Sequence, residues 1–171
     1  YFNTIDVFDI QRIEVLRGSG SVQYGSDALG GAIQAFSRDA VLRDDPHWAA
    51  GALWRGATQG MEQSLHSDVQ YSSRRIAFTG GISRRVFGDP VGGDTTGRQS
   101  PGGYKELAFE LKGKFALAPN TFLTVAHQNV RQRHIPVFHK VQLEDYALNE
   151  FDPQARALTY ARLERQLQRG I

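Results

Sequence analysis

The sequence predicts a mostly β protein built from antiparallel strands. Apolar and polar residues alternate along several runs, which is the period of a strand with two different faces. A glycine-dense segment separates the first two runs, and later runs are joined by connections that differ greatly in length. No apolar run reaches the roughly 18 residues that a membrane-spanning helix needs, so a helical membrane protein is excluded.

The first two predicted strands lie within residues 10–36. Ile13 and Val15 alternate with Glu14 in the first, and the second contains Ile33. Glycines are dense between and beside them, at Gly18, Gly20, Gly25, Gly30 and Gly31. Glycine adopts backbone conformations that other residues tolerate poorly, so this segment predicts tight turns.

A polar stretch follows, and residues 41–46 are predicted to be a linker because charged residues and a proline gather there. Six further strands are expected at about residues 48–57, 65–71, 76–83, 106–117, 121–130 and 157–167. The fourth has the clearest alternation, with Leu107, Phe109 and Leu111 between charged residues. The sixth also permits a helix, and we favour a strand.

The connections between these six strands alternate in length. Residues 72–74 and 118–120 are tight turns, whereas residues 87–103 and 131–156 are long loops. Outer-membrane β-barrels have short turns at the periplasmic end and long loops at the outer end. The connection at 56–60 is short for an outer loop. A soluble antiparallel sandwich would produce the same alternation of apolar and polar residues, so both architectures stay open here.

Composition is compatible with either architecture. The 171 residues are 40% hydrophobic and carry a formal net charge of +2, without a block of like charges, so nucleic acid is not a predicted partner. The absence of cysteine excludes disulfides and thiolate chemistry. Residues 1–10 lack the pattern of a signal peptide, which we expect to have been cleaved or to lie upstream.

Three spaced elements of the glycine-dense segment carry a family resemblance. They are Ile-Glu-Val-Leu-Arg-Gly at 13–18, Tyr-Gly-Ser at 24–26 and Gly-Gly-Ala-Ile at 30–33. Together they resemble the last part of the plug domain of TonB-dependent outer-membrane receptors. Ser19 stands where that family commonly has proline, and residues 34–36 also depart from the usual pattern.

The resemblance implies that residues 1–40 are the C-terminal part of a plug domain and residues 47–171 the first strands of a transmembrane β-barrel. Barrels that enclose a plug use about 22 strands. We therefore expect the chain to be an internal piece of a longer protein. The segment that contacts the energy-transducing partner is expected before Tyr1, and the closing strand is expected after the chain.

The function implied by the resemblance is import of a scarce nutrient across the cell outer membrane, without enzymatic activity. The substrate would be a small molecule or metal chelate: a ferric siderophore, haem, cobalamin or a glycan. The implied partners are a TonB-type energy-transducing complex and outer-membrane lipid, and no cofactor is implied. The alternative from another class is a soluble β-sandwich binding module without transport function.

Two groups of plug residues are candidate functional residues. Ser19, Gln23 and Tyr24 lie in the segment that we expect to face the ligand, together with the two long loops. Arg12, Glu14 and Arg17 are expected to pair with charges inside the barrel, with Glu110, Lys112 and Lys114 as possible partners. Ile13 and Val15 would then face the plug core. The alternative for the charged residues is an ordinary solvated strand face.

Tryptophans near both ends of the first strand of the larger set fit the aromatic girdles of a membrane barrel. Trp48 and Trp54 are six residues apart, which is about 20 Å of strand and close to the height of an apolar band. Two core tryptophans on one face would have the same spacing.

No metal or catalytic site is predicted. His127, His134 and His139 are candidate ligands of a metal or haem, because imidazole is the usual nitrogen ligand, but their spacings of seven and five residues match no zinc signature, and we favour solvated loop histidines. The acidic residues Glu144, Asp145, Glu150 and Asp152 lack the order of a calcium loop and are interpreted as loop charges. The glycines around Ser19 lack the spacing of a nucleotide-binding fingerprint.

Overall fold

The computed structural model describes residues 4–18, 20, 25, 28, 30–93 and 95–167. The chain divides into two compact units, one formed by Val7–Asp39 and the other by Tyr1–Asp6 with Ala40–Ile171. Strands dominate both units, so the predicted mostly β class is confirmed. None of the helices in the described part of the chain has the length and apolar character that crossing a bilayer requires.

The smaller unit is an antiparallel hairpin. A 3₁₀ turn, η2 (Val7–Asp9), leads into β1 (Ile10–Arg17), which pairs with β2 (Gly31–Ser37). Val15 lies opposite Ile33, and Leu16 lies opposite Ala32. Both strands occur where the alternation predicts them. Ile13, Val15 and Ile33 are more than half exposed, so the described chain supplies no core over this face of the hairpin.

Gly31, at the start of β2, is required by its surroundings. Its φ is +146°, a conformation that residues with a side chain rarely adopt. A Cβ at this position would also lie 2.5 Å from the carbonyl oxygen of Leu16 on the opposite strand. Glycine therefore permits the two strands to approach at the point where they enter the connecting segment.

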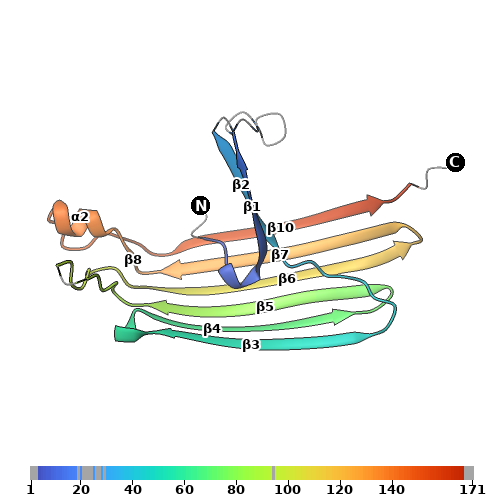
Figure 1. Ribbon diagram of the computed structural model, residues 1–171, viewed down its shortest axis with the longest axis horizontal. Helices are drawn as coiled ribbons and strands as arrows, with labels where there is room; N and C mark the ends of the chain where they lie inside the picture. The colour runs from blue at the N-terminus through green and yellow to red at the C-terminus, as the bar shows by residue number, and fades with distance from the viewer. Residues whose placement is uncertain are drawn as a thin grey trace. The chain divides into compact units, whose positions relative to one another are not determined.

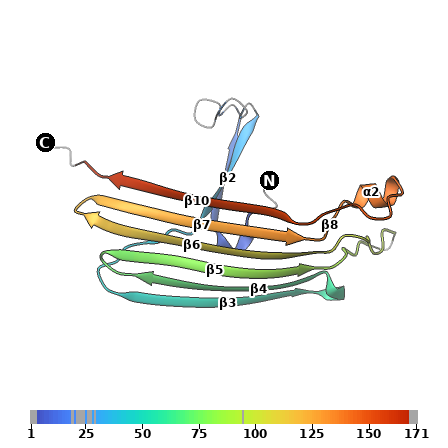
Figure 2. The same ribbon diagram turned by 180° about the vertical axis from the view of Figure 1, so that it is seen from behind.

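The larger unit is dominated by one antiparallel sheet, shown in Figure 1 and from behind in Figure 2. Within the described residues it has six strands in the order β10-β7-β6-β5-β4-β3. Their bounds are β3 (His47–Ala57), β4 (Glu62–Ser72), β5 (Ile76–Phe87), β6 (Tyr104–Ala118), β7 (Thr121–Arg133) and β10 (Gln154–Arg165). Each strand pairs with the next strand of the meander, as short-range antiparallel connections favour.

The strand register gives the sheet two chemically different faces. Along β6, Leu107, Phe109 and Leu111 are 43–55% exposed, whereas Glu106, Ala108 and Glu110, which alternate with them, are buried. The register carries this alternation across the sheet, because residues paired on neighbouring strands point to the same side. One face is therefore apolar and exposed, and the other is polar, with buried side chains on β4, β5, β6 and β7.

Both tryptophans lie on the apolar face and are exposed, Trp48 by 62% and Trp54 by 71%. The ring of Trp48 lies 4.6 Å from that of Tyr71 and 5.5 Å from that of Phe78, measured between centroids. These three residues are cross-strand neighbours in one row of the sheet. The interpretation of the tryptophans as buried core residues is therefore wrong, although they do share a face.

Short turns lie at one end of the sheet and longer connections at the other. The turns at 73–75 and 119–120 are short. The other end carries η3 (Thr58–Gly60), the loop 88–103, and the loop 134–153, which contains β8 (Ile135–Pro136), α2 (Phe138–Leu143) and β9 (Glu150–Phe151). Figure 1 shows α2 and β8 beyond that end of the strands.

The boundaries of several predicted elements differ from the structure, most of all at β5, which ends at Phe87 instead of 83. β4 begins at Glu62 instead of 65, and β7 continues to Arg133 instead of ending at 130. The last strand, β10, begins at Gln154 and ends at Arg165, so the helical alternative for this segment is wrong. Backbone pairing with the neighbouring strand extends each strand beyond the residues whose alternation is visible in the sequence.

We predict that Gly31→Ala destabilises the hairpin by about 1–3 kcal/mol, because the new Cβ meets the Leu16 carbonyl and the backbone conformation becomes strained. Amide hydrogen exchange in β1 and β2 measures the effect. Gly30→Ala is the matched control, since a Cβ there has no atom within 4 Å. Equal protection in both variants would contradict the prediction.

Candidate functional site

The candidate functional site is the polar face of the sheet, where charged and amide side chains are buried together. Its centre is an ion pair between Arg85 on β5 and Glu106 on β6, which are direct cross-strand neighbours. The Arg85 Nε donates a hydrogen bond of 2.8 Å to Glu106 Oε1. Gln132 of β7 donates from Nε2 to the other oxygen, Glu106 Oε2, at 2.6 Å.

Burial makes this network energetically important. The Arg85 side chain is 7% exposed and the Glu106 side chain 0%. Charges out of contact with water are costly unless they are paired and hydrogen-bonded, and here both carboxylate oxygens accept hydrogen bonds. The network thereby links three adjacent strands, β5, β6 and β7, through their side chains.

The segment before the hairpin contributes one more carboxylate. Asp6 belongs to the same compact unit as the sheet, and its Oδ1 lies 4.0 Å from the Arg85 guanidinium. Its side chain is 4% exposed. Arg85 thus has carboxylates from two parts of the chain within ion-pair distance, and one of these parts precedes the hairpin.

Two further polar contacts extend along the same face. His66 Nδ1 on β4 lies 2.7 Å from Ser83 Oγ on β5, and both residues are buried. On β7, Gln128 donates from Nε2 to Glu110 Oε2 at 3.1 Å. Lys112, one position further along this face of β6, is also buried. The face therefore presents charges of both signs in a largely water-excluded layer.

The predicted plug charges lie on β1. Arg12 Nε donates to Glu14 Oε1 at 2.8 Å, and both side chains are about half exposed. The Arg12 guanidinium also lies 4.0 Å from the centre of the Phe36 ring on β2. Arg17 is exposed at the end of β1. Pairing of these residues with Glu110, Lys112 or Lys114 stays a prediction.

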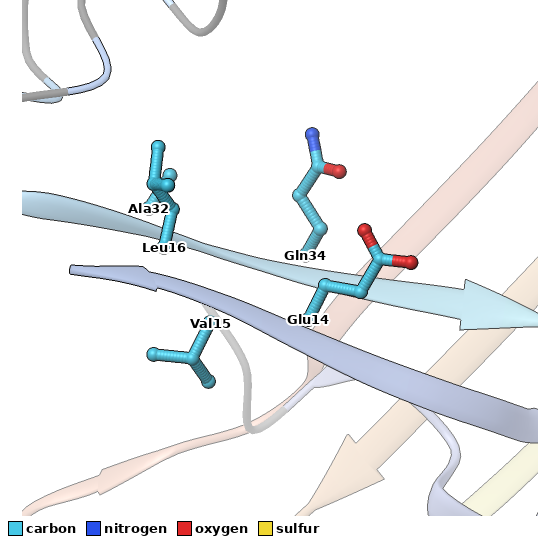
Figure 3. A pocket seen from close by; sticks show the side chains of 5 residues that line it. All are labelled: Glu14, Val15, Leu16, Ala32 and Gln34. Carbon is cyan, nitrogen blue, oxygen red and sulfur yellow. The ribbon is translucent and has the colours of Figure 1, made fainter.

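A small open hollow lies on the hairpin beside this ion pair (Figure 3). Its lining residues are Glu14, Val15, Leu16, Ala32 and Gln34. Figure 3 shows the Glu14 and Gln34 side chains on one side of the hairpin and Val15 on the other. The adjacent carboxylate and amide give this side of the hairpin hydrogen-bonding groups, whereas the opposite side is apolar.

The other predicted ligand-facing residues, Ser19, Gln23 and Tyr24, lie outside the described residues. The long loops that were predicted with them are described in large part. Asp89 organises the loop 88–103 by accepting hydrogen bonds at Oδ1 from the backbone N–H of Gly102, at 2.8 Å, and of Gly103, at 3.2 Å. Gln142 of α2 donates to the carbonyl oxygen of Ser100 at 2.7 Å, which joins the two long loops.

The hydrogen bond from Gly102, with further help from Ser100 and Gly103, lowers the pKa of Asp89 below its ordinary value of 3.8. A lowered pKa in the folded loop means that the ionised carboxylate is the form that stabilises it. This contribution is present above the ordinary pKa and is lost as pH falls through the lowered one. Asp89 is therefore ionised at neutral pH, and its stabilising contribution to the loop is then fully present.

Sequence reasoning found only part of the polar network. The inward direction of Glu110, Lys112 and Lys114 follows from the alternation in β6. Arg85, Gln132 and His66 were not singled out, because their importance depends on which strands become neighbours. In the sequence these residues are marked only by being polar at positions that the alternation of each strand directs to the polar face.

We predict that Glu106→Gln destabilises the protein by about 3 kcal/mol, because Arg85 keeps its buried charge and loses the carboxylate paired with it. Urea unfolding of the protein in detergent measures the change. Arg162→Gln is the control: its ion pair with Glu164 at 3.2 Å is exposed and should be worth about 0–1 kcal/mol. Similar losses in both variants would show that burial adds nothing.

Comparisons with known proteins bear on the smaller unit. The family model of the TonB-dependent receptor plug domain matches residues 1–32. This range contains β1, the start of β2 and the glycine-dense segment between them. A search of curated proteins found no match. Residues 1–32 are therefore similar to the plug domain of TonB-dependent receptors, which confirms the resemblance found in the sequence.

Proposed function

We propose that this chain is part of a TonB-dependent outer-membrane receptor that imports a scarce nutrient. In this proposal residues 1–40 are the C-terminal part of the plug, residues 41–46 a linker, and residues 47–171 strands of the barrel wall. The plug-family match at residues 1–32 supports the receptor family. The two-faced sheet of the larger unit supports a wall between lipid and a polar interior.

The observation that carries the proposal is the orientation of the two faces. In a soluble sandwich the apolar face of a sheet is packed against a second layer and the polar face meets water. In the described chain the apolar face, with Trp54, Leu111 and Leu163, is exposed, whereas polar side chains of the central strands on the other face, such as Ser64, Glu106 and Gln132, are buried. This is the reverse of the sandwich pattern and suits a wall whose outer side faces hydrocarbon.

Among the described residues, one arrangement resembles a catalytic triad, but it gives no support to an enzymatic function. Ser83, His66 and Asp68 combine the residue types of a hydrolase triad. Ser83 is 1% exposed, however, so a substrate could not reach its hydroxyl. His66 Nε2 is 3.5 Å from Asp68 Oδ1, longer than an ordinary hydrogen bond. The transporter proposal therefore stands without a catalytic step.

The proposed route of the nutrient begins at the loop end of the sheet. The loops 88–103 and 134–153 would contact the ligand together with Ser19, Gln23 and Tyr24 of the plug. The hydrogen bond between Gln142 and Ser100 supports a shared surface, because it holds both loops together. Arg12, Glu14 and Arg17 would form breakable ion pairs with the wall, and a TonB-type complex would supply the force that releases the plug.

Membrane insertion is tested by placing the same substitution on both faces. Leu111 is 55% exposed on the apolar face, and Leu158 is 38% exposed on the polar face, opposite Gln128. We predict that Leu111→Arg lowers the unfolding free energy in bilayers by about 2–4 kcal/mol, because a charge would face hydrocarbon. Leu158→Arg should change it by less than about 1 kcal/mol, because Arg would lie among polar groups.

Urea unfolding in lipid vesicles measures both free energies, and fractionation of cells shows how much of each variant reaches the outer membrane. Only Leu111→Arg should be depleted there. If both variants behave alike, or if the wild-type protein is recovered in the soluble fraction, the wall proposal fails and the soluble sandwich becomes the better account.

Transport is tested separately by growth. Cells without the protein should fail to grow on one limiting nutrient among ferric siderophore, haem, cobalamin and glycan, and the restored gene should rescue growth. Cells that keep the protein but lack the TonB-type partner should fail on the same nutrient. Growth on a small nutrient supplied in excess is the control. Unimpaired growth on all four limiting nutrients would contradict the import proposal.

A further inference from the structure

The base of the loop 134–153 gathers three side chains that can bind a metal. His134 directly follows β7, Glu150 lies in β9 and Asp152 follows β9. The short β8–β9 ladder pairs Ile135 with Phe151 and brings the two sides of the loop together. The N–H of Val137 donates to the Asn149 carbonyl at 2.8 Å and extends this clamp. Backbone pairing therefore fixes where the three side chains start.

The donor atoms converge on a small volume. His134 Nδ1 lies 3.3 Å from Glu150 Oε1 and 3.3 Å from Asp152 Oδ2. One ligand atom from each of the three residues lies within 4.8 Å of the other two. The contact to Glu150 is a hydrogen bond longer than the usual 2.9–3.0 Å, and an N–H shared with Asp152 would form a three-centre bond. A shared N–H would therefore give this arrangement only one weak three-centre hydrogen bond.

A tetrahedral metal ion matches it better. Zn²⁺ binds imidazole nitrogen and carboxylate oxygen at about 2.0–2.2 Å, which places neighbouring ligand atoms about 3.3–3.6 Å apart. The two nitrogen–oxygen distances agree with that edge length. Charge agrees as well: a divalent cation neutralises both carboxylates, whereas a protonated histidine neutralises one.

We propose that His134, Glu150 and Asp152 bind a divalent transition-metal ion of the Zn²⁺ class, with the fourth position open to water. A nitrogen ligand and only two carboxylates disfavour Ca²⁺, which takes 6–8 oxygen ligands. The bound ion would link the end of β7 to the start of β10 across the loop. This site is independent of the transport proposal and departs from the prediction that these residues are solvated loop charges.

The test is calorimetric titration of the purified protein in detergent with Zn²⁺ alone. One ion should bind per chain. His134→Ala, Glu150→Gln and Asp152→Asn should each weaken binding at least tenfold, because each removes one of three ligands. The matched controls are His139→Ala and Glu144→Gln, which change the same residue types in the same loop and should leave the affinity within twofold.

Co²⁺ provides a second readout, because a tetrahedral site gives strong visible absorption and an octahedral one gives weak absorption. Glu150→Gln and Asp152→Asn keep side-chain size, and circular dichroism of the strands reports whether each variant folds. Three results would overturn the proposal: no saturable Zn²⁺ binding, equal losses in the His139 and His134 variants, or a weak octahedral Co²⁺ spectrum.

Discussion

The two-residue period of the strand is the constraint on which the larger unit depends. Because Glu106 and Leu107 are adjacent in β6 yet face opposite sides, a shift of one residue in pairing would exchange the two faces completely. The ion pair between Arg85 and Glu106 opposes such a shift, since it forms only when these residues are paired. The buried ion pair therefore specifies the strand register more strictly than the exposed apolar residues do.

The hairpin and the sheet differ in which of their charged and apolar residues are exposed. In the sheet, Arg85 and Glu106 are buried and paired, and large apolar residues such as Leu111 are exposed. In the hairpin, the Arg12–Glu14 pair is exposed, and Ile13, Val15 and Ile33 form an uncovered apolar face on the other side. Exposed ion pairs contribute little to stability, so the hairpin depends more on its strand pairing and on Gly31.

Much of this structure can be predicted from the sequence, and the contacts that cannot be predicted have a common cause. The alternation in Leu107, Phe109 and Leu111 predicts a strand and its two faces without knowledge of its partners. The links from Arg85 to Glu106 and from His134 to Asp152 cannot be predicted in this way. They join residues 21 and 18 positions apart, and their meeting depends on register and on where loop ends are clamped. The pattern within one segment of sequence predicts the periodicity of a strand, whereas these sites form only when distant segments pair.

The hydrogen bond from Gln142 to the Ser100 carbonyl has a mechanical consequence. Two long segments that are tethered only at their own ends would fluctuate independently, each with its own amplitude. With a cross-link between them, a displacement of α2 is passed to the backbone near Ser100, and from there to the turn that Asp89 holds closed. The two loops are therefore coupled at one point, and a displacement of either is transmitted to the other only while the hydrogen bond between Gln142 and Ser100 is formed.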